Sequence, residues 1–336
     1  MNQQLLFQQF TAYCKPIFDD SLNYGTLKTA TEKLHQLFIE IGAINAYEQP
    51  INRKLLTNGE ALSPQEGALC LFDIARTRTF ARGLLQAIQQ QKALQVNQPI
   101  EVLYAGCGPY GLLSLLVIPY LTEADVQFTL IDIFDSSIQS VKKIVEALGV
   151  GSFFKNFIVA DATQYIPTQT FDILLTETMQ QALKKEPQVA ITHHLVHFIK
   201  PTGFLLPTQI DVYPVFENTS KRIAALMGND DYDSNVDSYA HAPIITLNKE
   251  NALRAQHSKN IYETSIHLHD VAYLKAPYQL QLQTHIHVFA NEILTLNNAA
   301  ITLGFQLMPA ADLLGKQAIH FKYVINEMPG VQYCIA

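Results

Sequence analysis

Hydrophobic and polar positions follow three different patterns along the chain. Residues 1–48 repeat apolar side chains at the three- and four-residue spacing of amphipathic helices. Residues 99–208 alternate short unbroken apolar runs with longer amphipathic stretches, which predicts buried parallel strands joined by helices. After Pro207 apolar and polar residues alternate, and this pattern predicts strands at residues 210–216, 262–269, 280–291, 300–307 and 318–325.

These patterns together predict an α/β fold with three regions. An N-terminal helical region covers residues 1–62, an α/β domain covers residues 63–208, and a β-rich, barrel-like domain covers residues 209–336. The second region should open at Ser63-Pro64-Gln65-Glu66, because the serine and the glutamate can form a capping box around a proline in the first turn. We expect the helix that follows to run to about Gln90.

A glycine-rich turn lies at the centre of the α/β region. The apolar run Val102–Ala105 predicts a buried strand, and Gly106, Gly108 and Gly111 follow it directly before an apolar helix. Glycine lets the backbone pass close to a ligand, and a helix N-terminus presents free N–H groups. The stretch therefore predicts a nucleotide cradle. Its G-x-G-x-x-G spacing also fits dinucleotide-binding folds, so an NAD-dependent oxidoreductase is one alternative.

Acidic residues end three further predicted strands. Asp132 follows an apolar run about twenty residues after the glycine turn, where an acid binds the two ribose hydroxyls of a nucleoside. Asp161 and Glu177 end the next two strands, and Asp161 is placed to face an adenine amine. Acids at the ends of successive strands indicate one edge of an open α/β sheet, which is where such sheets bind ligands.

With these residues the chain resembles the class I S-adenosylmethionine-dependent methyltransferases. Gly106, Gly108 and Asp132 stand where that family has its cofactor loop and its ribose acid. The resemblance implies a Rossmann-like methyltransferase domain that binds S-adenosyl-L-methionine. It also places Tyr104 and Ala162 in the cofactor site, although Tyr104 stands where the family usually has an acid. Likewise, a tyrosine at position 110 replaces the third glycine of the family's loop.

Two other segments resemble the protein arginine methyltransferases. Asp73-Ile-Ala-Arg76-Thr-Arg-Thr-Phe80 matches their D-x-x-R-T-x-T-[YF] segment, with Asp73, Arg76 and Phe80 expected on one helix face. The resemblance implies that Arg76 grips the cofactor's carboxylate, which suits a guanidinium fork. Glu177 and Glu186 keep the nine-residue interval of the family's two-glutamate loop. They are implied to orient the acceptor as catalytic residues, with Glu177 also in the cofactor site.

The resemblance is closer in the cofactor half than in the acceptor half. The family's T-H-W loop is not found, because the chain has no tryptophan. Thr178 replaces the tryptophan that usually follows the first glutamate, and the aromatic helix that shields the cofactor is not recognisable before Ser63. Residues 217–259 are predicted to be a polar, partly helical insertion. By the same resemblance this insertion is a candidate dimerisation arm, so a homodimer is possible.

Composition narrows the possible partners and location. The formal net charge is −7 and no basic run is present, which argues against a nucleic-acid partner. The N-terminus lacks the pattern of a signal peptide, and no apolar run approaches the length of a membrane span. Four scattered cysteines (Cys14, Cys70, Cys107 and Cys334) without C-x-x-C spacing indicate reduced thiols in a cytoplasm.

Two H-x-H strings, His267-Leu-His269 and His285-Ile-His287, each place two imidazoles on one face of a predicted strand. Four imidazoles that meet can bind zinc or iron, but polar strand faces explain the same pattern, and we predict no metal site. A strand histidine as a base on the acceptor side is a further alternative.

The sequence as a whole predicts a cytoplasmic methyltransferase that uses S-adenosyl-L-methionine. Its acceptor would be an amine, a guanidine or another nucleophile of a protein, a peptide or a small molecule. Besides the oxidoreductase, the other alternative is a non-catalytic, nucleoside-binding interaction protein that keeps the methyltransferase fold. Tyr104 and Thr178 are the residues that favour this last alternative.

Overall fold

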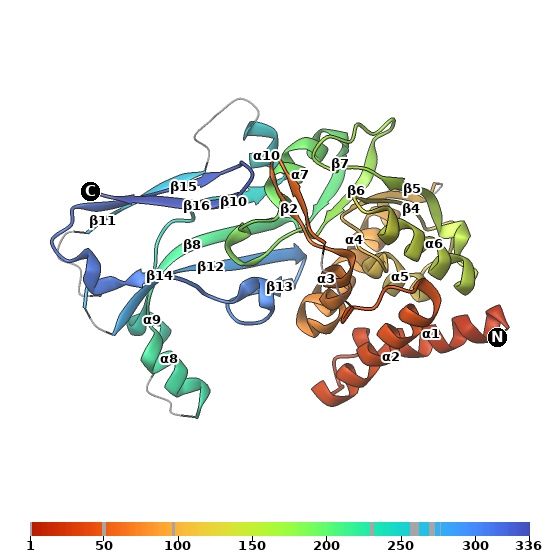
Figure 1. The fold of residues 1–336 in the computed structure, drawn as a ribbon, viewed down its shortest axis with the longest axis horizontal. Coiled ribbons are helices and arrows are strands. Elements are labelled where there is room, and N and C mark those ends of the chain that lie inside the picture. Colours follow the sequence, from red (N-terminus) through yellow and green to blue (C-terminus); the bar gives the residue numbers. More distant parts are fainter. Residues whose placement is uncertain are drawn as a thin grey trace.

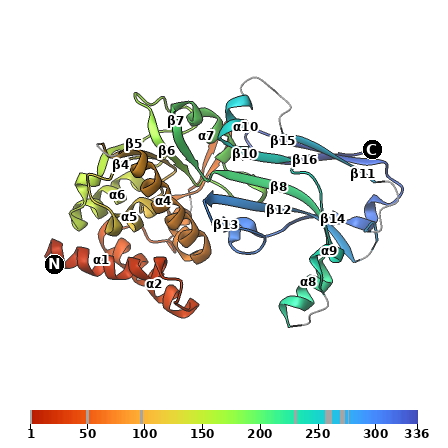
Figure 2. The same ribbon diagram turned by 180° about the vertical axis from the view of Figure 1, so that it is seen from behind.

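The protein is made of a helix-covered parallel sheet and, beside it, two antiparallel sheets (Figure 1). The computed structural model describes residues 2–48, 52–95, 98–228, 232–255, 262–268, 273–275 and 277–336. The view from behind shows the same two parts side by side, with the N-terminal helices beneath the parallel sheet (Figure 2). The predicted α/β fold class is confirmed.

Five parallel strands form the first sheet, in the order β5-β4-β3-β6-β7. Their side chains are largely buried because helices cover both faces, as the unbroken apolar runs predict. The strands are β3 (Ile100–Ala105), β4 (Val126–Asp132), β5 (Phe154–Val159), β6 (Phe171–Thr176) and β7 (Ile199–Leu206). The order along the sheet places the carboxyl ends of β3, β4 and β6 next to one another.

Helices pack around this sheet, and two of them come from the N-terminal end of the chain. The helices that precede the sheet in the sequence are α3 (Pro64–Leu69) and α4 (Ile74–Leu94). The helices that follow its strands are α5 (Leu112–Val117), α6 (Asp135–Leu148) and α7 (Gln188–Leu195). The predicted N-terminal helices are α1 (Gln3–Phe18) and α2 (Tyr24–Gly42). Helix α2 lies so close to α6 that a Cβ at Gly42 would be 2.3 Å from Ser140 Oγ. The guanidinium of Arg78, on α4, donates to the carbonyl oxygens of Ile17 and Asp19 at the end of α1.

Antiparallel strands form the rest of the protein. In the larger sheet β8 and β12 are the two long central strands. Strands β10 and β9 pair with β8, and strands β13 and β14 pair with β12. A second sheet has the order β11-β15-β16, and β1 and β2 form a separate hairpin. The strands are β1 (Lys54–Leu56), β2 (Gly59–Ala61), β8 (Gln209–Asn218), β9 (Ser238–Ala240), β10 (Ile245–Asn248), β11 (Glu263–His267), β12 (Tyr278–Phe289), β13 (Glu292–Leu294), β14 (Phe305–Pro309), β15 (Ala318–Val324) and β16 (Gly330–Ile335).

Three short helices interrupt this antiparallel part. They are α8 (Thr219–Leu226), α9 (Ser234–Asp237) and α10 (Lys249–Ala255). Helices α8 and α9 extend away from the sheets, whereas α10 lies against the parallel-sheet part near α7 (Figure 1). All three fall within the predicted insertion at residues 217–259, which is therefore partly helical as expected.

Two local predictions were wrong. The helix expected from Ser63 to about Gln90 is broken, because Asp73 ends a 3-10 turn and caps the N-terminus of α4 instead of lying on a helix face. Pro201 and Gly203 both lie within β7, where a Cβ on Gly203 would lie 2.6 Å from the carbonyl oxygen of Asp172. The strand expected at residues 300–307 begins with a 3-10 turn and continues as β14, and β16 was not predicted.

The described residues contain neither a membrane-spanning helix nor a cluster of metal-ligating side chains. No helix in this part of the chain is long and apolar enough to cross a membrane. Within the same residues, no group of three or more histidine, cysteine, aspartate or glutamate side chains is arranged to hold a metal ion. His269, one member of the first H-x-H string, lies outside the described residues.

Candidate active site

A cavity of about 940 Å³, including its open mouth, lies over the carboxyl ends of β3, β4 and β6. Helix α3 and the hairpin β1–β2 contribute the opposite wall. All nine residues selected from the sequence line this one cavity: Arg76, Tyr104, Gly106, Gly108, Asp132, Asp161, Ala162, Glu177 and Glu186. Their individual roles remain predictions, but the structure brings the whole set together.

The glycine turn after β3 forms the floor of the cavity. Gly106 and Gly108 have φ angles of 75° and 64°, a backbone region that other residues rarely adopt. The N–H of Gly106 donates to the carbonyl oxygen of Ile131 at 2.8 Å, which ties the turn to the end of β4. A Cβ on Gly106 would lie 2.2 Å from Thr178 Cγ2, whereas no atom lies within 4 Å of one built on Gly108. Gly106 is thus required by close packing, and Gly108 leaves open space.

Asp132 closes the turn from the end of β4. One of its carboxylate oxygens accepts from the N–H of Gly108 at 2.9 Å, and the other accepts from the N–H of Phe134 at 2.9 Å. The side chain is buried, and burial raises the pKa of Asp132 to about 6 despite these hydrogen bonds. Each carboxylate oxygen keeps a second acceptor position, so Asp132 can bind hydroxyl donors that enter the cavity.

Asp161 and Ala162 follow β5 at the side of the cavity. One carboxylate oxygen of Asp161 accepts from both the N–H and the hydroxyl of Thr163, at 2.8 and 2.7 Å. This local turn fixes the side chain and the backbone beside it. Ala162 is buried and lines the cavity.

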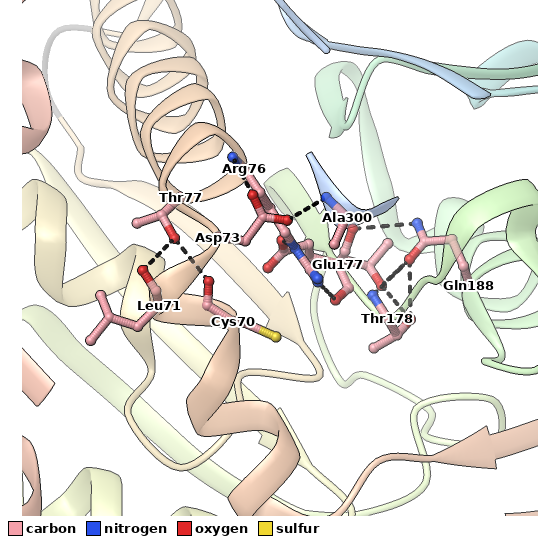
Figure 3. Close-up of polar contacts among 10 residues, drawn as sticks. Cys70, Leu71, Asp73, Arg76, Thr77, Glu177, Thr178, Gln188 and Ala300 are labelled. Carbon is pink, nitrogen blue, oxygen red and sulfur yellow. Dashed lines mark hydrogen bonds and ion pairs between the residues drawn. The ribbon is translucent and has the colours of Figure 1, made fainter. Parts of the chain in front are cut away.

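Arg76 projects from the first turn of α4 onto the end of β6 (Figure 3). Its Nε donates to a carboxylate oxygen of Glu177, and its Nη2 donates to the carbonyl oxygen of Glu177 at 3.3 Å. Both side chains are about nine-tenths buried. Burial raises the pKa of Glu177, and the positive charge of Arg76 opposes this shift. The pair therefore brings together two residues that the sequence separates by 101 positions.

Glu186 is the second acid at this end of the cavity. It is only 6% exposed, and its Oε1 has no hydrogen-bond partner among the described residues. Burial raises the pKa of Glu186 to about 7, although Arg76 is close enough to lower it. A buried carboxyl with an unused oxygen and a pKa near neutrality can accept a hydrogen bond or a proton from a bound molecule.

The chain is similar to known proteins in its fold and not in its sequence. No family model and no curated protein matches the sequence. The solved structures that match include a Trypanosoma brucei PRMT1 enzyme–prozyme heterotetrameric complex with AdoHcy, at 13% identity and a TM-score of 0.51, over 79% of this chain and 90% of that one. They also include a crystal structure of PRMT6, at 10% identity and a TM-score of 0.54, over 79% of this chain and 97% of that one.

This chain has the fold of the protein arginine methyltransferases. At these low identities the likeness shows the fold alone. The predicted resemblance is confirmed at the level of the fold, including the combination of a parallel sheet with antiparallel sheets.

Sequence reasoning missed the wall of the cavity that faces the sheet. Leu56, Ala61 and Leu62, from or beside the hairpin β1–β2, line the cavity together with Cys70. The only local signal was Asn58-Gly59, a turn dipeptide between two short segments. It predicts a turn but does not say that the hairpin folds over a site more than forty residues further along the chain.

Two departures from the class I methyltransferase pattern have structural explanations. Tyr110, in place of a third glycine, donates its hydroxyl to the carbonyl oxygen of Ile44 at 2.8 Å and lies 3.0 Å from His35 Nδ1. It therefore connects the glycine turn to α2 and the segment after it. Tyr104 is 2% exposed at the cavity wall, and burial raises its pKa, so it contributes a neutral phenol in place of an acid.

Replacing Arg76 with glutamine should destabilise the protein by about 3 kcal/mol at neutral pH, because Glu177 then stays buried without a cation. The loss should grow as the pH rises above the ordinary range of a glutamate pKa. Without Arg76 the folded pKa of Glu177 rises further above its unfolded value, so deprotonation increasingly favours the unfolded chain. Urea unfolding of both proteins as a function of pH measures the difference.

Arg78→Gln is the matched control, because the Arg78 guanidinium binds the carbonyl oxygens of Ile17 and Asp19 and the exposed carboxylate of Asp20, and touches no cavity residue. Its loss of stability should vary much less with pH, because its carboxylate partner is exposed. A loss in Arg76→Gln that varies equally little with pH would contradict the described pairing.

Proposed function

We propose that this protein is a cytoplasmic methyltransferase that uses S-adenosyl-L-methionine and methylates a nitrogen atom of a protein or peptide acceptor. The observation that carries the proposal is the single cavity in which a nucleoside cradle and two buried glutamates meet. The fold shared with arginine methyltransferases supports the same conclusion, and one of those structures is described as a complex with AdoHcy.

The residues present fit this cofactor. The open space at Gly108 and the two carboxylate oxygens of Asp132 suit a ribose, whose hydroxyls donate to an acid at this position. Asp161 and Ala162 lie where an adenine ring would be held. Arg76 is the one cation among the described residues that line the cavity, so it is the group available for the carboxylate of the methionine moiety.

S-adenosyl-L-methionine supplies a methyl group activated by its bond to a positively charged sulfur. The protein's part is to hold an acceptor nitrogen in line with that bond and to exclude water. Glu177 and Glu186 perform the first task, since two carboxylates can accept N–H bonds from a planar guanidine or from an amine. The hairpin β1–β2, with Leu56 on the cavity side, performs the second.

Glu186 is also the group best suited to take up the proton that the acceptor nitrogen loses. It is buried beside Glu177 and has a free oxygen, and its raised pKa matches an acceptor near neutral pH. Glu177 is less suited, because Arg76 already holds one of its oxygens. We therefore assign orientation of the acceptor to both glutamates and proton uptake to Glu186.

The cofactor assignment predicts a specific loss of affinity. Asp132→Ala should weaken binding of S-adenosylhomocysteine by about 2 kcal/mol, because charge-assisted hydrogen bonds to two hydroxyls are removed. Asp132→Asn should lose less, since one acceptor remains. Isothermal titration calorimetry measures both variants. Equal affinity of Asp132→Ala and wild type would refute the ribose assignment, and tighter binding of NAD than of S-adenosylhomocysteine would favour an oxidoreductase.

The acceptor assignment predicts both a rate effect and a pH effect. Glu186→Gln should keep cofactor affinity and lose methyl transfer to an arginine-containing peptide by about a hundredfold. In the wild type the rate should rise with pH through about 7, where the buried carboxyl loses its proton. The variant should lack this rise. Transfer of a labelled methyl group at saturating cofactor measures both effects.

Glu146→Gln, on the exposed face of α6, is the control and should leave transfer unchanged. Near-normal turnover of Glu186→Gln would remove the guanidine mechanism and favour a hydroxyl or carboxyl acceptor, for which a second acid is dispensable. Cofactor binding without transfer to any acceptor in a cell extract would instead indicate a non-catalytic, nucleoside-binding protein.

We also propose that the protein forms a homodimer through α8. This helix extends away from the sheets (Figures 1 and 2), and Ile223, Leu226 and the adjacent Met227 are 58%, 73% and 84% exposed. Apolar side chains gathered on an extended element favour burial against another surface. A double Leu226→Glu and Met227→Glu variant should weaken self-association at least about tenfold.

Sedimentation equilibrium measures this association. Leu5→Glu, at a residue that is 57% exposed on α1, is the control for an added charge at an exposed apolar position. A wild type that sediments as a monomer at micromolar concentrations would contradict the dimer.

A further inference from the structure

The loop that carries Glu186 has an unusual backbone. We call residues 180–187 the acid loop. Within it Ala182, Leu183 and Lys185 have φ angles of 56°, 52° and 67°. Residues with a Cβ rarely adopt positive φ, and three within four positions persist only when the surroundings impose them. What holds the acid loop in this conformation therefore also decides where the Glu186 carboxylate points.

Hydrogen bonds from the antiparallel part hold each of these positions. The hydroxyl of Tyr323, on β15, donates to the carbonyl oxygen of Leu183 at 2.7 Å. Thr284 Oγ1, on β12, accepts from the N–H of Ala182 at 2.9 Å. Pro329, in the turn between β15 and β16, accepts from the N–H of Lys185 through its carbonyl oxygen at 2.8 Å.

The hairpin β1–β2 adds a fourth contact from the other side. The N–H of Glu60 donates to the carbonyl oxygen of Lys185 at 2.8 Å, and a Cβ on Gly59 would lie 2.7 Å from the same oxygen. The peptide unit next to Glu186 is thus held from two directions. Glu186 Oε1 itself has no partner among the described residues, so the backbone of the loop, and not a bond to that oxygen, fixes it.

Tyr323 is the most specific of these supports. Its ring is buried and packs edge-on against Tyr262, with ring centroids 6.5 Å apart, which leaves its hydroxyl directed to Leu183. The carbonyl oxygen of Leu183 is the acceptor, and the residue itself is fully buried, so water is a poor replacement for the lost donor. Removing the hydroxyl would leave a strained and buried segment without one of its restraints.

We propose that Tyr323 is a positioning residue, which holds the acid loop so that Glu186 faces the acceptor. This inference rests on the proposed function for its catalytic consequence, but not for its structural one. Tyr323 belongs to the hairpin β15–β16, which lies more than 130 residues after Glu186 in the sequence. This hairpin then affects methyl transfer without contacting the acceptor or the cofactor.

Tyr323→Phe removes the hydroxyl and keeps the ring. Methyl transfer at saturating cofactor should fall about tenfold, and S-adenosylhomocysteine affinity should stay within about twofold of wild type. The midpoint of the pH–rate profile should move below that of wild type, because a loosened loop lets water reach Glu186 and lowers its pKa. Hydrogen exchange of the Ala182 and Lys185 amides should be faster in the variant.

Tyr278→Phe is the matched control. Its ring is also buried and its hydroxyl also donates to a backbone carbonyl oxygen, that of Val236 at 3.1 Å, but it lies away from the acid loop. It should change neither transfer nor exchange of the loop amides. This control separates loss of a buried tyrosine hydroxyl in general from loss of the one that holds the loop.

A double-mutant cycle tests whether the supports act through one loop. Thr284→Val removes the acceptor for Ala182 and nearly preserves the side-chain shape. Its effect on transfer should combine with that of Tyr323→Phe less than additively, whereas Tyr278→Phe and Tyr323→Phe should combine additively. Thr284→Val by itself keeps the proposal testable if Tyr323→Phe folds poorly, because it removes another restraint on the same loop.

Two outcomes would overturn the proposal. One is unchanged amide exchange in Tyr323→Phe, and the other is a loss of cofactor affinity as large as the loss of transfer, which would indicate a general structural role. A wild type that shows no transfer to any acceptor would overturn the proposed function instead. In that case faster exchange in Tyr323→Phe would still support the role of Tyr323 in holding the loop.

Discussion

The charge of Arg76 is the constraint on which the cavity depends. Among the described residues that line it, Arg76 is the one cation, and four residues carry carboxyl groups: Asp132, Asp161, Glu177 and Glu186. Burying acids without a cation is costly, and the raised pKa values of three of them reflect this cost. Arg76 pairs with Glu177, and its positive charge opposes the upward shift of the Glu177 pKa, while Glu186 keeps an oxygen without a partner among the described residues.

Asp73 links this charge to the rest of the protein. One carboxylate oxygen caps α4 by accepting from the N–H of Arg76 at 3.3 Å, and the other accepts from the N–H of Ala300 at 2.8 Å (Figure 3). The start of α4 is thereby fixed both to its own helix and to a loop of the antiparallel part. The break in the predicted helix is thus what directs the Arg76 side chain over the end of β6.

The parallel sheet and the antiparallel part contribute different residues and restraints to the cavity. The parallel sheet supplies the glycine turn and Asp132 from the ends of adjacent strands, where local geometry suffices. The acid loop depends on long-range support, because its positive φ angles are unfavourable and are held by residues of β12 and β15. Cofactor binding and acceptor orientation should therefore respond differently to changes in the antiparallel part.

The sequence by itself determined the features that depend on neighbours in the chain. Apolar runs predicted the strands of the parallel sheet, and glycine spacing predicted the turn after β3. Acids at strand ends identified Asp132, Asp161 and Glu177, because parallel strands present their carboxyl ends at one edge. The resemblance to known methyltransferase segments added Arg76 and Glu186, and all of these residues line the cavity.

Only the tertiary structure decided which of these residues pair and what covers them. The Arg76–Glu177 pair and the support from Tyr323 join residues that lie about 100 or more positions apart in the sequence. The unused oxygen of Glu186 depends on burial. The cavity wall formed by the hairpin β1–β2 likewise depends on the contact between Glu60 and Lys185. Local periodicity carries no information on such contacts, because they follow from how whole elements pack and exclude water.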